Sequence, residues 1–71
     1  MNATTPKAKT RRIVRDESIA ASLAGELVNC GYWFACRLLG ESGDQYEFAV
    51  AREHGDQLSQ MIATARHRAG K

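Results

Sequence analysis

A single β-hairpin pattern lies between two helical patterns, and this order limits the folds open to the chain. Residues 32–39 are rich in aromatic side chains, and residues 46–52 alternate apolar with polar side chains, which is the period of a strand with one buried face. The segment between them, residues 40–45, concentrates Gly, Ser and Asp, which are residues of tight turns. Two strands joined by so short a turn form an antiparallel hairpin.

The helix before the hairpin is predicted over residues 17–30. Apolar side chains recur there at helical spacing and form one stripe, which consists of Ile19, Ala20, Leu23, Ala24, Leu27 and Val28. Asp16 is suited to cap the first turn, and Glu17 adds negative charge where the helix dipole favours it. Gly31 suits a left-handed C-terminal cap.

The helix after the hairpin is expected to begin near Asp56 and to end at Gly70. Its apolar positions follow the same helical rule and are Leu58, Met61, Ile62, Ala65 and Ala69. Basic residues in its last turn complement the helix dipole. Each helix thus has one apolar face, so both are expected to pack on the same side of the hairpin.

The N-terminal residues 1–10 are polar and include the only proline, so we expect a disordered basic arm followed by one domain, residues 11–71. Ile13 and Val14 form either a short edge strand or the run-in to the first helix. The predicted fold class is therefore α+β, with two helices on one face of an antiparallel hairpin. The element order is α-β-β-α, or β-α-β-β-α if Ile13 and Val14 lie on a strand.

Strand alternation divides the hairpin into two faces. The expected core face carries Tyr32, Phe34, Cys36, Leu38, Tyr46, Phe48 and Val50. The other face carries Trp33, Ala35, Arg37, Leu39, Glu47, Ala49 and Ala51. Two helices cover only one face, and in 71 residues no further segment remains to cover the second. Trp33 on an open surface of small residues is the type of anchor that binding interfaces use.

Charge is distributed unevenly along the chain. Residues 7–15 contain five basic and no acidic residues, and residues 66–71 contain three basic and no acidic residues. Residues 16–65 contain two basic and eight acidic residues. The net charge of +2 therefore conceals an acidic middle and two basic ends.

These features favour a non-catalytic binding or inhibitory protein over an enzyme. In size and charge, but in no motif, the chain is analogous to small inhibitors that phages and mobile elements encode. The expected partner is a protein or nucleoprotein with a basic surface, and a second copy in a homodimer is a further expectation. The candidate protein-binding residues are Trp33, Arg37, Glu41, Asp44 and Glu47.

The alternative is a small nucleic-acid-binding regulator. Basic ends neutralise phosphates and give an affinity that weakens with salt. The candidate residues for this function are Lys9, Arg11, Arg12, Arg15, Arg66 and Arg68. An acidic middle section argues against it, because a nucleic-acid-binding domain is expected to have a basic face.

Catalysis and cofactor binding have little support. The sequence contains no Gly-rich phosphate loop and no nucleophile elbow. The two cysteines and two histidines, Cys30, Cys36, His54 and His67, do not follow the spacing of a zinc site. We therefore expect no metal and no cofactor. The least favoured alternative is a compact nuclease with His54 or His67 as general base.

The location is expected to be the cytoplasm. No apolar run approaches the roughly 18 residues of a membrane helix, and no apolar segment follows the basic N-terminal stretch as in a secretory signal. Two cysteines are too few for a disulfide scaffold. We therefore expect a soluble protein with reduced thiols.

Overall fold

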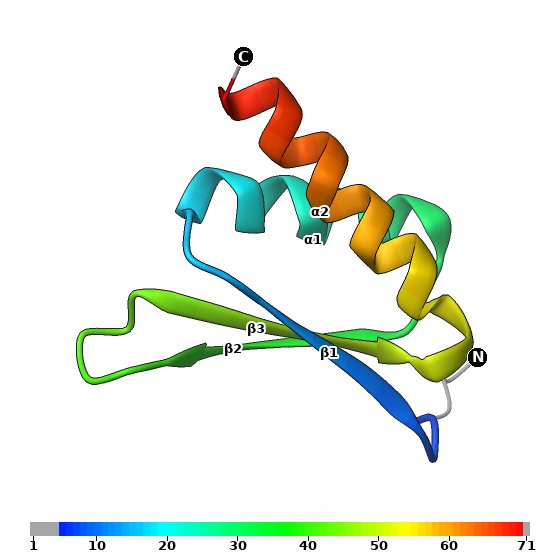
Figure 1. Cartoon of the computed structure of the whole chain (residues 1–71). Coiled ribbons are helices and arrows are strands. Elements are labelled where there is room, and N and C mark those ends of the chain that lie inside the picture. Colours follow the sequence, from blue (N-terminus) through cyan, green and yellow to red (C-terminus); the bar gives the residue numbers. More distant parts are fainter. Residues whose placement is uncertain (1–4, 71) are drawn as a thin grey trace.

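The computed structural model describes residues 5–70 and has an α+β fold (Figure 1). Its elements in chain order are β1 Lys9–Val14, α1 Glu17–Cys30, β2 Phe34–Leu39, β3 Gln45–Ala51, a 3-10 turn Arg52–His54 and α2 Gly55–Gly70. Ile13 and Val14 are part of a strand, so the observed order is β-α-β-β-α. Because β1 begins at Lys9, the last two residues of the expected arm, residues 1–10, belong to the sheet; residues 1–4 lie outside the described part.

The three strands form one antiparallel sheet in the order β1-β3-β2. The central strand β3 pairs with β2 through the predicted hairpin and with β1 on its other side. Helix α1 connects β1 to β2, which run parallel to each other with β3 between them. The sheet therefore has two edges, the outer side of β1 and the outer side of β2.

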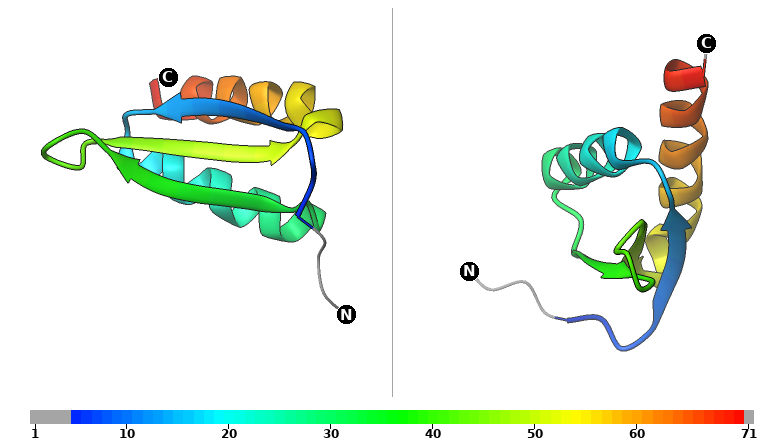
Figure 2. Two further views of the ribbon diagram at one scale, coloured as in Figure 1. Left: turned by 90° about the horizontal axis from the view of Figure 1, so that it is seen from below. Right: turned by 90° about the vertical axis from the view of Figure 1, so that its left-hand side faces the viewer.

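Both helices lie on one side of the sheet, as Figure 2 shows. Helix α1 lies on the β2 side and helix α2 on the β1 side. The core between the layers consists of Val14, Ile19, Ala20, Leu23, Leu27, Phe48, Val50, Leu58 and Ile62. Most of these residues come from the predicted helical stripes and from the central strand, while β1 contributes only Val14. Within residues 5–70, no helix has the length and hydropathy of a membrane-spanning segment.

The ends of α1 match the sequence expectation. Asp16 Oδ1 accepts hydrogen bonds from the backbone N–H of Ser18 at 2.8 Å and of Ile19 at 3.3 Å, which are donors that the helix leaves free. The hydroxyl of Ser18 also donates to Asp16. This hydroxyl, followed by the backbone N–H groups of Ile19 and Ser18, lowers the pKa of the Asp16 carboxyl below its ordinary value. Gly31 ends the helix with a φ of 74°, a conformation that favours glycine.

Helix α2 begins against β1. It starts at Gly55, one residue before the expected Asp56, and Gly55 is buried. A Cβ atom on Gly55 would lie 2.8 Å from Oγ1 and 3.1 Å from Cβ of Thr10, which is closer than side chains pack. The absence of a side chain at Gly55 therefore allows the start of α2 to approach β1.

Two residues expected on the core face are exposed. Leu38 is 60% exposed and Cys36 is exposed as well, although both point toward the helix side of the sheet by their register. The hairpin extends beyond the N-terminal end of α1 (Figure 1), so the helices do not cover the outer part of β2. Ala49 shows the converse. It points to the uncovered side and is buried, because it lies on the central strand between Arg11 of β1 and Ala35 of β2.

Candidate functional site

The sheet face that points away from the helices is uncovered on all three strands. Cross-strand partners of an antiparallel pair point to the same face. The register therefore assigns to this face Lys9, Arg11, Ile13, Ala35, Arg37, Leu39, Gln45, Glu47, Ala49 and Ala51. Figure 2 (left) is a view onto it, with both helices behind the strands. We call these residues, together with Trp33, the open face.

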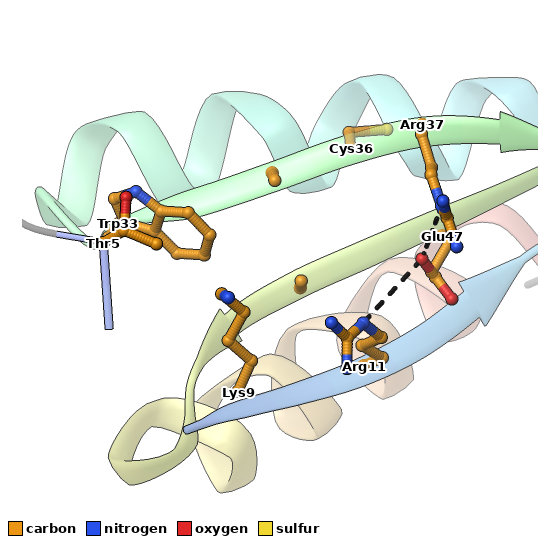
Figure 3. A pocket seen from close by; sticks show the side chains of 9 residues that line it. Thr5, Lys9, Arg11, Trp33, Cys36, Arg37 and Glu47 are labelled. Carbon is orange, nitrogen blue, oxygen red and sulfur yellow. Dashed lines mark hydrogen bonds and ion pairs between the residues drawn. The ribbon is translucent and has the colours of Figure 1, made fainter. Parts of the chain in front are cut away.

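A hollow of about 310 Å³ lies on the open face. Ala35 and Ala49 leave room at its centre, and longer side chains from all three strands and from Trp33 surround them. Its lining consists of Thr5, Lys9, Arg11, Trp33, Ala35, Cys36, Arg37, Glu47 and Ala49. Figure 3 shows Trp33 and Lys9 toward one end, and Arg11, Glu47 and Arg37 toward the other. An aromatic ring and a group of charges thus share one concave surface.

Lys9 is the cation next to the aromatic ring. Its Nζ lies 5.8 Å from the centre of the Trp33 ring, within the range of a cation–π interaction, which contributes about 0.5–1 kcal/mol at an exposed site. Both residues are half-buried. The contact holds the ring beside the hollow and leaves part of its surface open to solvent.

Glu47 lies between two arginines of the outer strands. Its Oε1 is 2.9 Å from Nε of Arg37 and 4.0 Å from Nε of Arg11. The side chain of Glu47 is only 16% exposed, whereas those of the arginines are 56% and 69% exposed. Exposed ion pairs contribute little stability, so the main effect of the pairing is to orient two guanidinium groups over the open face.

The open face carries a net charge of +2, since three cations, Lys9, Arg11 and Arg37, face one carboxylate, Glu47. Two of these cations, Lys9 and Arg11, come from β1, and Lys9 was expected to belong to the arm. Although residues 16–65 of the sequence are acidic, the open face of the sheet is therefore basic. Carboxylates of the described chain lie instead on α1, in the hairpin loop and near the start of α2, at Glu17, Glu26, Glu41, Asp44, Glu53 and Asp56.

The other predicted basic residues lie away from the open face. Nε of Arg12 donates to Oγ of Ser59 on α2 at 3.2 Å, so Arg12 points toward the helices. Arg66 lines one surface depression with Arg12 and another with Arg15. Arg68 lines a depression between the two helices. The six residues proposed to bind nucleic acid therefore do not form one surface. Only Lys9 and Arg11 lie on the open face, and Arg12, Arg15, Arg66 and Arg68 line depressions elsewhere.

The residues proposed for protein binding are also divided. Trp33, Arg37 and Glu47 lie on the open face. Glu41 and Asp44 are exposed in the hairpin loop, beyond the end of β2 that is distant from Trp33. They therefore do not form one surface with the tryptophan.

The two histidines considered as general bases are separate. The ring of His54 stacks on Tyr32 with 3.9 Å between the ring centres, and its Nε2 lies 3.7 Å from a carboxylate oxygen of Glu53. His67 is exposed near the end of α2. In the described residues, no three His, Cys, Asp or Glu side chains lie close enough together to hold a metal ion. Partial desolvation raises the pKa of the Cys36 thiol above its ordinary value.

Comparison with protein-family models, with curated proteins and with solved structures found no match for this chain. The class that the fold and the open face define is a small α+β protein with one uncovered, basic and partly aromatic sheet face.

Lys9 and Arg11 lie on the same face as Trp33, which was not predicted from the sequence. The signal was present as alternation over residues 9–14, in which Lys9, Arg11 and Ile13 alternate with Thr10, Arg12 and Val14. It was weak because a single core residue, Val14, marks the buried side of this strand.

Proposed function

We propose that this chain is a small, non-catalytic binding protein whose open face holds a single-stranded nucleic acid. The observation that supports this proposal is the pairing of β1 with β3, which puts Lys9 and Arg11 on the same face as Trp33 and Arg37. Proteins that bind single strands combine a basic surface with an aromatic side chain on which a base stacks. The open face has both features.

The arrangement assigns a role to each group. The exposed part of the Trp33 ring offers a stacking surface to an unpaired base, which contributes about 1–3 kcal/mol in proteins of this type. Lys9, Arg11 and Arg37 lie around the same hollow, where they attract the phosphates. A base in a duplex is already stacked on both sides, so this face favours an unpaired strand.

The expected affinity is modest and depends on salt. The carboxylate offsets one of the three cations, and the remaining charge of +2 neutralises about two phosphates. The logarithm of the binding constant should therefore fall with the logarithm of salt concentration with a slope of about −1.4. Such a protein would bind several sequences similarly, because stacking and phosphate contacts carry little sequence information.

The test uses the fluorescence of Trp33, which is the only tryptophan of the chain. Titration with a single-stranded oligothymidylate at low salt should quench the emission, and added salt should restore it. A blunt duplex of the same length should quench it much less. If the single strand has no effect at low salt, the proposal is wrong.

A pair of double variants identifies the surface. Lys9→Gln with Arg11→Gln should weaken binding by about tenfold or more. Arg52→Gln with Arg68→Gln removes the same charge from exposed positions off the open face and should change the affinity by less than about threefold. Equal losses in the two double variants would mean that only net charge matters, and the open face would then not be the site.

A protein partner is the second candidate, and the hollow of about 310 Å³ beside Trp33 favours it. Because the open face is net positive, an acidic segment fits it better than the basic surface expected from the sequence. Titration with polyglutamate of matched charge distinguishes the two candidates. Quenching of Trp33 as strong as with the oligonucleotide would favour the acidic protein segment.

A further inference from the structure

The two edges of the sheet differ in a way that bears on self-association. An unpaired edge strand exposes backbone N–H and C=O groups to any other strand, and monomeric proteins protect such edges with charged residues, above all lysine. The edge strand β1 carries three basic residues in six positions, Lys9, Arg11 and Arg12. The edge strand β2 has the sequence FACRLL, and its one charge, Arg37, is paired with Glu47 of its own chain.

The surface next to the β2 edge is apolar on the helix side. Leu38 of β2 is 60% exposed, and Cys36, which shares its face of the strand, is also exposed. Helix α1 lies on the same side of the molecule as β2 (Figure 2). The edge strand with the unprotected backbone therefore carries two exposed side chains of low polarity, Leu38 and Cys36.

We propose that β2 pairs with β2 of a second copy of this chain, so that two sheets join into one antiparallel sheet of six strands. A two-fold axis perpendicular to the sheet relates the copies and keeps all four helices on one side. The open faces of the two copies then form one continuous surface. This proposal does not depend on what the open face binds.

The charges on β2 select the register. Paired residues must point to the same face, so one residue of β2 lies opposite itself in the second copy, with the axis midway between the two. The longest overlaps are centred on Cys36 or on Arg37. Centring on Arg37 would set this arginine opposite its own copy, which is unfavourable. Centring on Cys36 sets Arg37 opposite Ala35 and Phe34 opposite Leu38 of the second copy, and no like charges meet.

The same register supplies the apolar contact that a dimer needs. A stable interface buries roughly 1,200–2,000 Å² in total, and strand pairing over a few residues is only part of that. On the helix side, this register sets Leu38 of each copy against Phe34 of the other. Burial of these side chains removes apolar surface from water, which is the main favourable contribution to association.

The first test is the mass of the protein in solution, measured by light scattering and sedimentation from low micromolar to millimolar concentration. We expect twice the mass of one chain as concentration rises. Leu38→Lys should raise the dissociation constant by at least about tenfold. Because Leu38 is 60% exposed, this variant should keep its circular dichroism spectrum. Ile13→Lys, at an exposed position of β1, is the matched control and should leave the dimer intact.

The second test is chemical cross-linking, which is independent of Leu38. Directly opposed residues have Cβ atoms about 4.5–5.5 Å apart, so a short bismaleimide should join Cys36 to Cys36 of the second copy. The Cys30→Ser variant should cross-link and the Cys36→Ser variant should not. A monomer at every concentration would overturn the proposal, and so would a dimer that Ile13→Lys but not Leu38→Lys disrupts, or cross-links formed only through Cys30.

Discussion

The ammonium group of Lys9 lies 5.8 Å from the ring centre of Trp33, although the two residues belong to opposite edges of the sheet. The central strand β3 runs between them. Lys9 pairs with Ala51 on that strand, and Ala49 lines the hollow beside it. The short side chains of β3 leave the space across which lysine and tryptophan meet. The contact therefore depends on small residues in the centre of the sheet as well as on the two partners.

Replacement of Lys9 by methionine tests this contact. Methionine keeps a flexible, unbranched side chain that is one atom shorter, and removes the charge. We expect unfolding free energy to fall by no more than about 1 kcal/mol and the emission maximum of Trp33 to move. The slope of oligonucleotide affinity against salt should become shallower by about 0.7, the contribution of one phosphate contact. An unchanged slope would place Lys9 outside the binding site.

Replacement of Glu47 by glutamine tests the charge balance of the open face. Glutamine can still accept a hydrogen bond from Arg37, and the net charge of the face rises from +2 to +3. We expect tighter binding of single strands at low salt, with a slope steeper by about 0.7. Glu41→Gln removes the same charge from the hairpin loop and is the control. Weaker binding of Glu47→Gln would mean that the carboxylate is needed to orient the arginines.

The cap of α1 predicts a pH dependence of stability. The pKa of Asp16 is lowered in the folded state, so the capping contribution is present above the pKa of an unfolded aspartate, about 3.9. It is lost as the pH falls through the lower folded value. The melting temperature of Asp16→Ala should therefore lie below that of the parent at neutral pH, and the difference should shrink in acid.

The control for this prediction is Asp16→Asn, which caps without titrating. The difference in melting temperature between Asn and Ala should persist at every pH. If the deficit of Asp16→Ala is as large in acid as at neutral pH, the carboxylate is not the cause of it.

The core is small, so single truncations in it should be costly. Leu58 on α2 is fully buried, and Leu58→Ala is expected to lower the unfolding free energy by about 2–5 kcal/mol. In a chain of 71 residues this is a large part of total stability. Gln57→Ala, at the exposed neighbouring position, should change it by less than about 0.5 kcal/mol. Urea denaturation measures both, and similar losses would contradict the assigned core.

The contact between Gly55 and Thr10 gives a prediction with an internal control. Gly55→Ala places a Cβ within 3.1 Å of Thr10 Cβ, which rotation of the threonine side chain does not relieve, so we expect a loss of about 1–3 kcal/mol. Gly25→Ala on α1 meets no atom within 4 Å and should instead gain about 0.5–1 kcal/mol from helix propensity. Thr10→Ala should restore part of the loss in Gly55→Ala, and no restoration would contradict the contact.

Much of the fold follows from local patterns in the sequence. The bounds of α1, its cap at Asp16 and the left-handed Gly31 follow from residue types within a few positions of each other. The hairpin likewise follows from the turn residues at 40–45 and from the alternation of apolar and polar side chains over residues 46–52. β1 was harder to assign, because its sequence KTRRIV has one core residue, and its identity as a strand comes from pairing with β3 far along the chain.

The candidate site was predictable only in part, for the same reason. Trp33, Arg37 and Glu47 share a face through the hairpin alone. The addition of Lys9 and Arg11 needs the position of β1 beside β3, which reverses the sign of the charge expected there. The exposure of Leu38 was also outside the reach of the sequence, since alternation gives the side of the sheet but not how far the helices extend over it.

Alternate residues of strand β1 point to the open face and to the helix side of the sheet. Lys9 and Arg11 face outward, while Thr10 between them touches Gly55 at the start of α2. A ligand that shifts β1 from outside must change the packing at Gly55 on the far side of the strand. The amide signal of Gly55 in a nuclear magnetic resonance spectrum is therefore a reporter of occupancy, and it requires no label or substitution where the ligand binds.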